Sequence, residues 1–205
     1  MTLFEVNKSQ GNLIFDSDGT VLNSLNIKRA VAADVFTELG FANSAELATE
    51  FSSLTGARAS KLHVLETKYN RSISLVDFDA IFTDCLVLRA DEIQVRTGLD
   101  ELRAATEGRM WYLLTNGSQN ETRKIYERLG ILDLFDGGIW GSPSDKSTHI
   151  ETFGFGPNDL MLSDSREDYE LGKEFGIPFV YLAGWNSRSD AEFFKSFGQA
   201  AYFSF

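Results

Sequence analysis

The sequence has little that would suit a secreted or membrane-bound protein. Cys85 is the only cysteine among 205 residues, so no disulfide can form within the chain, as in a protein of a reducing compartment. No run approaches the roughly 18 apolar residues that a membrane-spanning helix needs. The first residues lack the basic segment, followed by an apolar one, that marks a chain for export. We therefore expect a cytoplasmic protein without a membrane partner.

Positive charge is also scarce. Lys and Arg total 19 against 30 Asp and Glu, which gives a formal net charge of −11. Such a charge repels phosphate backbones and anionic lipids over most of the surface, so we expect no nucleic-acid partner. Hydrophobic residues make up 43% and charged residues 24%, which is ordinary for a globular protein. The length fits one domain that carries a large insertion, as a monomer or a weak homodimer.

Short apolar runs alternate with helical patterns along much of the chain. Residues 120–130 and 166–176 place apolar side chains one helical turn apart and end in glycine. This alternation predicts an α/β fold with a Rossmann-like three-layer core and a mostly parallel sheet. The first ten residues would form a short extension or an extra edge strand. The predicted buried strands are Leu13–Phe15, Met110–Leu114, Gly138–Trp140, Leu160–Leu162 and Phe179–Leu182.

One long segment breaks the alternation. From about Leu25 to Arg96 the sequence shows helical patterns and no convincing strand. Some 70 helical residues between the first two strands are best explained as a helical cap inserted into an α/β core. We therefore predict a core domain of residues 1–22 and 97–205 and a helical cap domain of residues 23–96.

Two carboxylates follow the first predicted strand directly. Asp16 and Asp18 stand in the segment Asp-Ser-Asp-Gly-Thr, at the strand end where open α/β sheets bind ligands. Gly19 permits an unusual backbone after the strand. Two close carboxylates suit a divalent cation, or a division into nucleophile and acid–base. A turn with two solvated acids is the plainer alternative.

Three further polar groups follow later predicted strands. Thr115-Asn116-Gly117 precedes a helix and could bind an anion there, although an ordinary helix cap explains it as well. Lys146 could hold a phosphoryl group, or lie solvated on its helix. Asp164 and Asp168 are four residues apart, so on one helix face they would favour a hard cation such as Mg²⁺. Arg166 offers them a local ion-pair partner instead.

These motifs, taken in order, resemble those of the haloacid dehalogenase superfamily. Asp16-Ser17-Asp18-Gly19-Thr20 is similar to the first motif, Thr115-Asn116-Gly117 to the second, Lys146 to the third, and Asp164 with Asp168 to the fourth. A helical insertion directly after the first motif resembles the cap of phosphoglycolate phosphatase-like and β-phosphoglucomutase-like members. Ser17, Asn23 and Ser163 depart from the residues common in the family.

The resemblance implies a Mg²⁺-dependent phosphatase that hydrolyses a small phosphorylated metabolite, a sugar phosphate being one candidate, through an aspartyl-phosphate. Asp16 would be the nucleophile and Asp18 the general acid and base. The residues implied to hold Mg²⁺ are Asp16, the backbone carbonyl of Asp18, Asp164 and, through water, Asp168. Those implied to bind or stabilise the phosphoryl group are Gly19, Thr115, Asn116, Gly117 and Lys146.

The cap contains a segment that resembles the family's substrate-specificity loop. Arg58 and Lys61 are three residues apart and would share one face of a helix. A small cationic face on an acidic protein suits an anionic substrate, so both are candidate substrate-binding residues. A solvated charged face is the alternative.

Other activities fit the motifs less well. A β-phosphoglucomutase-type mutase would use the same core and return the phosphoryl group to the sugar. A true dehalogenase does not need Asp18, and phosphonate cleavage would want a cap lysine that forms a Schiff base. A phosphate-binding protein that is not an enzyme could keep the carboxylates, but would have no use for the cap.

Overall fold

The structure is a computed structural model, and it describes residues 10–54, 56–183, 185 and 188–196. The extension or edge strand predicted for the first ten residues therefore lies almost entirely outside the described residues. Within them, no helix has both the length and the apolar character needed to cross a bilayer.

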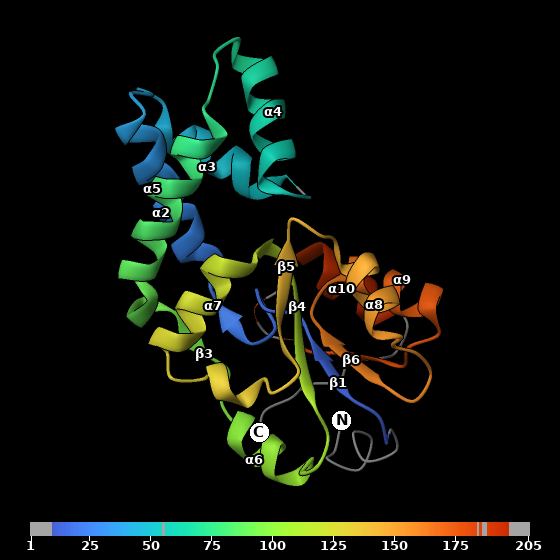
Figure 1. Ribbon diagram of the computed structural model, residues 1–205. Coiled ribbons are helices and arrows are strands. Elements are labelled where there is room, and N and C mark those ends of the chain that lie inside the picture. Colours follow the sequence, from blue (N-terminus) through green and yellow to red (C-terminus); the bar gives the residue numbers. More distant parts are fainter. Residues whose placement is uncertain (1–9, 55, 184, 186–187, 197–205) are drawn as a thin grey trace.

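A parallel sheet of five strands forms the centre of the core (Figure 1). Its strand order is β5-β4-β1-β6-β7, so the first strand of the chain lies in the middle. Leu13 of β1 is in register with Trp111 of β4 and with Leu160 of β6. The sheet confirms the predicted α/β class. The strands are β1 (Leu13–Phe15), β4 (Trp111–Ser118), β5 (Gly138–Ser142), β6 (Leu160–Ser163) and β7 (Phe179–Tyr181).

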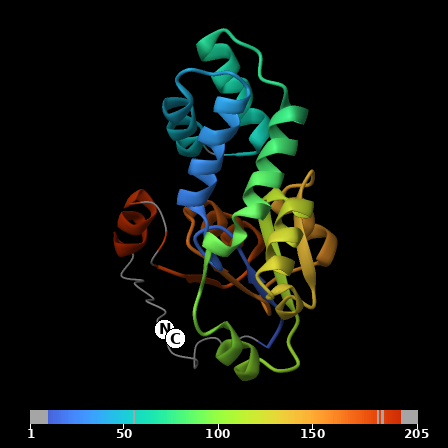
Figure 2. The same ribbon diagram turned by 90° about the vertical axis from the view of Figure 1, so that its left-hand side faces the viewer.

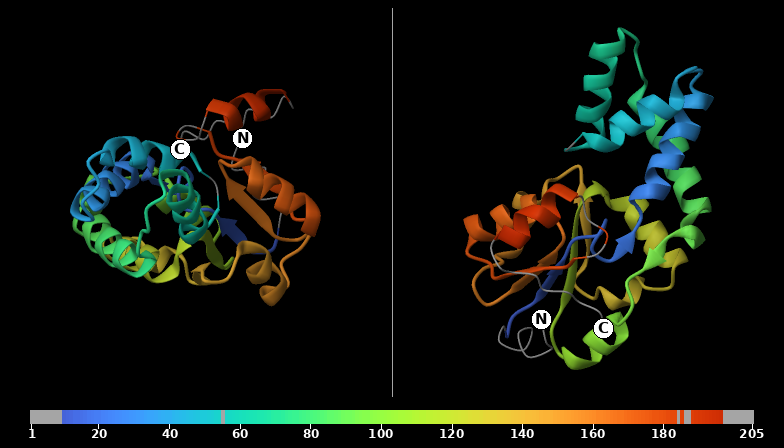
Figure 3. Two further views of the ribbon diagram at one scale, coloured as in Figure 1. Left: turned by 90° about the horizontal axis from the view of Figure 1, so that it is seen from above. Right: turned by 180° about the vertical axis from the view of Figure 1, so that it is seen from behind.

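Helices cover both faces of this sheet and complete three layers, as Figures 1 and 3 show. Trp111 and Leu113 pack with Ile125 and Tyr126 of α7 in one buried cluster. Ile14 and Met161 pack with Ile150 of α8 in a second cluster, on the other face. The core helices are α6 (Leu99–Ala105), α7 (Gln119–Arg128), α8 (Lys146–Phe153), α9 (Arg166–Phe175) and α10 (Arg188–Ser196), with 3₁₀ turns η1 (Ala90–Glu92) and η2 (Leu132–Leu134).

Four helices between the first two core strands form the cap, which stands over one end of the sheet (Figure 2). They are α2 (Leu25–Glu38), α3 (Ser44–Ser53), α4 (Arg58–Tyr69) and α5 (Leu75–Leu88). An antiparallel pair of two-residue strands, β2 (Leu22–Asn23) and β3 (Gln94–Val95), joins them to the core. The prediction of no strand between about Leu25 and Arg96 is therefore wrong at β3, because two residues are too few to show an alternating pattern.

A cluster of phenylalanine rings holds the cap helices together. Phe36 of α2 is fully buried. Its ring centroid lies 5.7 Å from that of Phe41, 6.1 Å from that of Phe51 on α3 and 5.2 Å from that of Phe78 on α5. Aromatic pairs at such distances add to the free energy gained by burying apolar surface. Phe36 thus lies at the centre of the cap packing, and the buried cluster continues from there into the core.

Replacing Phe36 should therefore destabilise the protein strongly. We expect Phe36→Ala to lower the free energy of unfolding by about 3–5 kcal/mol, because it leaves a cavity among three other rings. Val76→Ala is the control, because Val76 is 77% exposed and its loss should change the free energy by no more than about 0.5 kcal/mol. Urea unfolding followed by circular dichroism measures both. Equal losses in the two variants would contradict a packed cap centre.

Candidate active site

The parallel sheet brings the predicted site residues to one edge. Asp16 follows β1 and Asp164 follows β6, its neighbour in the sheet. Thr115 lies in the last part of β4, on the other side of β1. Lys146 is the first residue of α8, after β5, and its N-cap Asp145 accepts a hydrogen bond from the Thr148 backbone. Parallel strands end at the same edge of a sheet, so motifs more than 100 residues apart meet there.

Lys146 connects two of the predicted carboxylates. Its ammonium lies 2.7 Å from Asp16 Oδ1, and 2.8 and 2.9 Å from the two carboxylate oxygens of Asp168. Ser163 donates a further hydrogen bond of 2.6 Å to Asp168. Lys146 is 6% exposed, so the solvated lysine considered as an alternative is not what the structure contains. Both carboxylate oxygens of Asp168 thus accept hydrogen bonds within the protein, from Lys146 and Ser163.

Asp164 is held by the first motif. The Thr20 hydroxyl donates to Asp164 Oδ1 at 2.9 Å and accepts from the Asp164 backbone N–H at 3.0 Å. Gly19 has a φ of +86°, and a Cβ built there would lie 2.2 Å from Asp164 Oδ2. Glycine is therefore required at position 19 both by the backbone and by the close approach of Asp164.

The interpretation of Asp164 and Asp168 as one helix face was wrong. Helix α9 begins at Arg166 with Ser165 as its N-cap, so Asp164 precedes the helix. Arg166 lies 3.9 Å from Glu170, and the described residues include no ion pair between Arg166 and either aspartate. Asp164 faces Thr20 and Gly19, whereas Asp168 faces Lys146.

Negative charge at the site exceeds positive charge. Burial raises the pKa of Asp16 to about 6, although Lys146 opposes the change. Burial, together with the charge of Asp16, raises the pKa of Asp164 to about 8. Asp16 and Asp168 in turn hold the pKa of Lys146 above its ordinary value, against the effect of its burial. Lys146 contacts Asp16 and Asp168 but not Asp164, so a further cation near Asp16 and Asp164 would stabilise their ionised forms.

The oxygen atoms of Asp16 and Asp164 suit a Mg²⁺ ion that completes its coordination with water and phosphate, rather than a metal ion held entirely by protein side chains. Of the two Asp16 carboxylate oxygens, only Oδ1 has a hydrogen-bond partner within the described residues. Among these residues no three acidic, histidine or cysteine side chains form a ready metal site. Mg²⁺ commonly takes one or two carboxylates and fills its remaining positions with phosphate and water. Asp16 and Asp164 meet that requirement, while the contacts of Asp168 with Lys146 and Ser163 agree with at most an indirect role.

Asp18 does not join the other carboxylates in this structure. It accepts a hydrogen bond from the Ser24 hydroxyl and forms an ion pair of 2.5 Å with Lys28 of α2. Burial raises the pKa of Asp18, but Lys28 and Ser24 outweigh it and hold that pKa below its ordinary value. The second carboxylate of the first motif is therefore ionised and attached to the cap.

Ser17 and Ser163, two of the residues that differ from those common in the haloacid dehalogenase superfamily, make specific contacts. The Ser17 hydroxyl lies 3.0 Å from the buried Tyr126 hydroxyl of α7, which ties the segment between Asp16 and Asp18 to the core. Ser163, as described, holds Asp168. The buried Arg96 adds a third tie, because its guanidinium donates to the backbone carbonyls of Thr20 and of Gly19, the latter at 3.1 Å. The loop after β1 is thereby fixed from several sides.

The second motif lies beside the N-terminus of α7. Thr115 is buried, and its hydroxyl accepts a 3.0 Å hydrogen bond from the Gly117 backbone. Asn116 is exposed, and Ser118 is the N-cap of α7, accepting from the Glu121 backbone. Asn116 and Gly117 therefore meet a ligand approaching from the cap side before Thr115 does.

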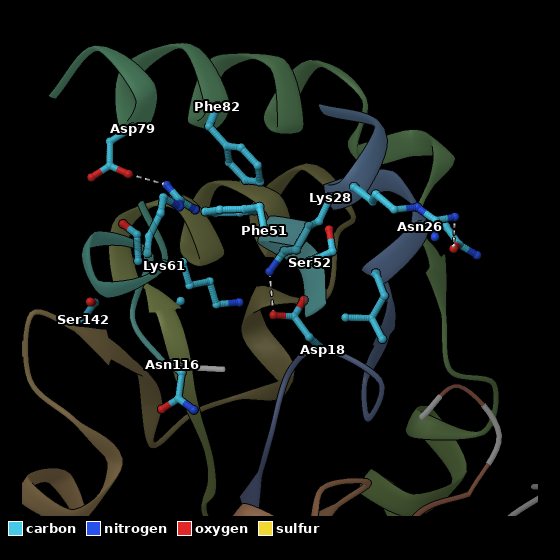
Figure 4. A pocket seen from close by; sticks show the side chains of 16 residues that line it. Asp18, Asn26, Lys28, Phe51, Ser52, Lys61, Asp79, Phe82, Asn116 and Ser142 are labelled. Atoms are coloured by element: carbon cyan, nitrogen blue, oxygen red, sulfur yellow. Dashed lines mark hydrogen bonds and ion pairs between the residues drawn. The ribbon is translucent and has the colours of Figure 1, made fainter. Parts of the chain in front are cut away.

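A pocket of about 380 Å³ lies between the core and the cap (Figure 4). Asp18, Asn116 and Gly117 line it from the core, while Phe51 and Phe82 contribute apolar walls from the cap. Both predicted cap cations, Arg58 and Lys61, also line it, together with Lys28 and Arg29. The pocket therefore brings Arg58 and Lys61 of the cap together with Asp18, Asn116 and Gly117 of the core, whereas Asp16 and Lys146 do not line it.

The two predicted cap cations have different partners. Arg58 lies 2.8 Å from Asp79 of the cap and 3.0 Å from both carboxylate oxygens of Glu121 in the core. Its guanidinium also stacks over the Phe82 ring, 4.2 Å from the centroid. Lys61 forms no ion pair with any carboxylate in the described part of the chain, and lies 5.4 Å from the Phe51 ring centroid. That both bind substrate stays a prediction.

Sequence reasoning missed several residues of this site. Lys28 and Ser24, the partners of Asp18, carry no motif, and Tyr126 and Arg96 are far along the chain from the loop they hold. A signal existed only for Lys28. It lies four residues after Ser24 on one predicted helix, so both could face the first motif.

The close approach of Gly19 to Asp164 can be tested directly. Gly19→Ala should lower the free energy of unfolding by more than Gly108→Ala does, because both glycines have a positive φ but only Gly19 has atoms in the way. Gly108 has a φ of +84° and nothing within 4 Å, so its substitution should cost only the backbone strain of about 1–2 kcal/mol. Denaturant unfolding compares the two. Equal costs would mean that Asp164 moves aside freely.

Comparison with known proteins relies on solved structures, because no family model and no curated protein matches the chain. A predicted phosphoglycolate phosphatase from Haemophilus somnus has a TM-score of 0.64 at 19% identity, over 87% of this chain and 89% of that one. A candidate β-phosphoglucomutase from Thermotoga maritima has a TM-score of 0.66 at 16% identity, over 95% and 94%. Both matches include the cap as well as the core.

A third match is a haloacid dehalogenase family hydrolase from Deinococcus radiodurans with bound phosphate and sodium. It has a TM-score of 0.59 at 18% identity, over 95% of this chain and 90% of that one. Similarity at such identities shows the fold. The chain therefore has the capped α/β fold of the haloacid dehalogenase-like proteins, which is the group that its motifs resemble.

Proposed function

We propose that the protein is a Mg²⁺-dependent phosphatase that hydrolyses a small phosphomonoester through an aspartyl-phosphate on Asp16. The observation that carries this proposal is the arrangement around Asp16. One of its carboxylate oxygens contacts the buried Lys146, while the other has no hydrogen-bond partner within the described residues. A carboxylate so placed, with one oxygen beside a cation and the other without a partner, suits covalent catalysis on phosphorus. The shared fold supports the same conclusion.

In the first step Asp16 attacks phosphorus, and the bond from phosphorus to the leaving oxygen breaks. Asp18 must first leave Lys28 and Ser24 and take up a proton from water, and it then donates that proton to the leaving oxygen. In the second step Asp18 takes a proton from water and the water oxygen attacks phosphorus. The bond between phosphorus and the Asp16 oxygen breaks, which frees the Asp16 carboxylate and inorganic phosphate. Mg²⁺, bound by Asp16, the Asp18 carbonyl and Asp164, would supply charge that offsets the repulsion between carboxylate and phosphate.

The remaining motif residues would bind the transferred group. Lys146, held by Asp168, offers a fixed positive charge beside Asp16. The Thr115 hydroxyl and the backbone N–H of Asn116 would donate to equatorial phosphoryl oxygens. Gly19 and Gly117 keep the two loops free of side chains, so that the phosphoryl group can approach the backbone. These assignments stay proposals for each residue.

A phosphosugar mutase is the second candidate. The similarity to a candidate β-phosphoglucomutase and the cap-covered pocket favour it. A hydrolysis screen over phosphorylated metabolites with Mg²⁺ present separates the two, because a phosphatase releases inorganic phosphate and a mutase releases an isomerised sugar phosphate. Absence of both products over the whole screen would leave a phosphate-binding protein that is not an enzyme.

Substitution of the two carboxylates of the first motif tests the covalent step. Asp16→Asn should abolish turnover, because an amide neither attacks phosphorus nor carries the charge of a metal ligand. Asp18→Asn should also stop turnover but accumulate phosphoenzyme, since attack by Asp16 is impaired less than hydrolysis. Rapid quench with ³²P-labelled substrate measures the trapped label. Wild-type activity in Asp16→Asn would contradict the covalent mechanism, and no label in Asp18→Asn would contradict the division of roles.

The fourth motif makes a separate prediction about the metal. We expect Asp164→Ala to raise the Mg²⁺ concentration for half-maximal activity more than about a hundredfold, because it removes a direct ligand. Asp168→Ala should raise it less, within the ten- to hundredfold typical of outer-shell residues. It should also lower kcat at saturating Mg²⁺, because Lys146 loses two hydrogen bonds. Activity titrated against Mg²⁺ measures the half-maximal Mg²⁺ concentration of both variants and the kcat of Asp168→Ala. Unchanged activity in both variants with a chelator present would contradict a metal site.

A further inference from the structure

The pocket between core and cap contains more positive charge than its own acids neutralise. Four cations line it, and three of them have a polar partner. Arg58 is paired with Asp79 and Glu121, and Lys28 with Asp18. Arg29 is exposed and donates to the Asn26 side chain at 3.3 Å. Lys61 remains without a carboxylate partner among the described residues.

Lys61 is nevertheless not a freely solvated lysine. Its side chain is half-buried, with the Phe51 ring 5.4 Å from its ammonium. Burial lowers its pKa, and the charges of Lys28 and Arg58 lower it further, against the opposing charges of Asp18 and Glu167. A cation that has lost part of its water and faces two other cations is stabilised when an anion binds beside it.

Lys28 and Lys61 point into the same space. Figure 4 shows both side chains extending from the cap toward Asp18, above Asn116. They come from different helices, Lys28 from α2 and Lys61 from α4, so the arrangement of the cap brings them together. Lys28 is paired with Asp18 in this structure, but Asp18 must leave it in order to protonate the leaving oxygen. Both ammonium groups can then bind an anion with several oxygens.

We propose that Lys28 and Lys61 together bind a second anionic group of the substrate, located on its leaving-group side. This inference rests on the proposed phosphatase function. The substrate class is then a small phosphomonoester that also carries a carboxylate or a second phosphate. A volume of about 380 Å³ limits it to a molecule of metabolite size.

The location of the two lysines separates this anion from the transferred phosphoryl group. Lys146 supplies the charge beside Asp16, at the end of β1, and belongs to the core. Lys28 contacts Asp18, the residue that would protonate the leaving oxygen, and so lies on the side to which the leaving group departs. The leaving group therefore enters the pocket that the two cap lysines line.

Two pairs of compounds test the inference. 3-Phosphoglycerate differs from glycerol 3-phosphate by a carboxylate in place of a hydroxymethyl group, and fructose 1,6-bisphosphate differs from fructose 6-phosphate by one phosphate. We expect the wild-type kcat/KM to favour the doubly anionic member of at least one pair by about tenfold or more. The pair that shows the preference identifies the second anion as carboxylate or phosphate.

Lys61→Met should remove most of that preference, lowering the ratio about tenfold, while Lys68→Met keeps the wild-type ratio. Lys68 is the matched control because it is a lysine of the same helix that pairs with Glu50 at 2.7 Å, outside the pocket. An equal fall of kcat/KM on both members of a pair would overturn the inference, because Lys61 would then contact the transferred group or support the fold. No preference in the wild type for either pair would overturn it too.

Two further measurements separate this inference from the proposed function. Hydrolysis of p-nitrophenyl phosphate with Mg²⁺ tests the phosphatase without a second anion. If no phosphomonoester is hydrolysed, the proposed function fails, and calorimetric titration of the same four compounds decides the anion site alone. Wild-type protein should then bind a doubly anionic compound about tenfold more tightly than its partner, and Lys61→Met should lose the difference. Equal affinities in the wild type would overturn the site.

Discussion

The contact of the Lys146 ammonium with Asp16 and Asp168 is the interaction on which the rest of the site depends. Lys146 and Asp168 are buried and Asp16 nearly so, and each would be costly without the others. The three residues come from α8, from the loop after β1 and from α9, so their contact requires the sheet order in which β1 lies centrally. The order of the strands in the sheet therefore positions these three charged groups.

Charge is divided unevenly between core and cap. The core site has three carboxylates, of which Lys146 contacts two, and burial together with their mutual repulsion raises the pKa values of Asp16 and Asp164. The cap side of the pocket has an excess of cations, of which Lys61 is unpaired within the described residues. In the proposed function, a metal ion would compensate the core carboxylates and an anionic substrate would compensate the cap cations. The net charge of −11 is unevenly distributed over the chain, because cations outnumber acids among the residues that line the pocket.

The sequence was sufficient to predict the five core strands, because short apolar runs that end in polar residues are a local signal. It also predicted that Asp16, Thr115, Lys146 and Asp164 would be near one another, since parallel strands end together. It failed where contacts link elements without a local pattern. No residue near Asp168 in the sequence indicates that its carboxylate accepts a hydrogen bond from Lys146. The strand β3 has only two residues, which are too few to show an alternating pattern. Arg58 and Glu121 are 63 residues apart in the sequence, so no local pattern indicates that they form an ion pair.

Arg58 and Lys61 show why a shared helix face does not imply a shared role. Both belong to α4 and both line the pocket. Arg58 joins Asp79 of the cap to Glu121 of the core, and Glu121, which is 1% exposed, also accepts a 2.9 Å hydrogen bond from Thr83 of α5. Because this ion pair crosses from cap to core, it fixes how the cap stands over the pocket. Removing Arg58 would leave the Glu121 carboxylate buried with one hydroxyl partner, which is costly. The charge of Arg58 is thus balanced by carboxylates that link cap and core, whereas Lys61 has no ion-pair partner among the described residues.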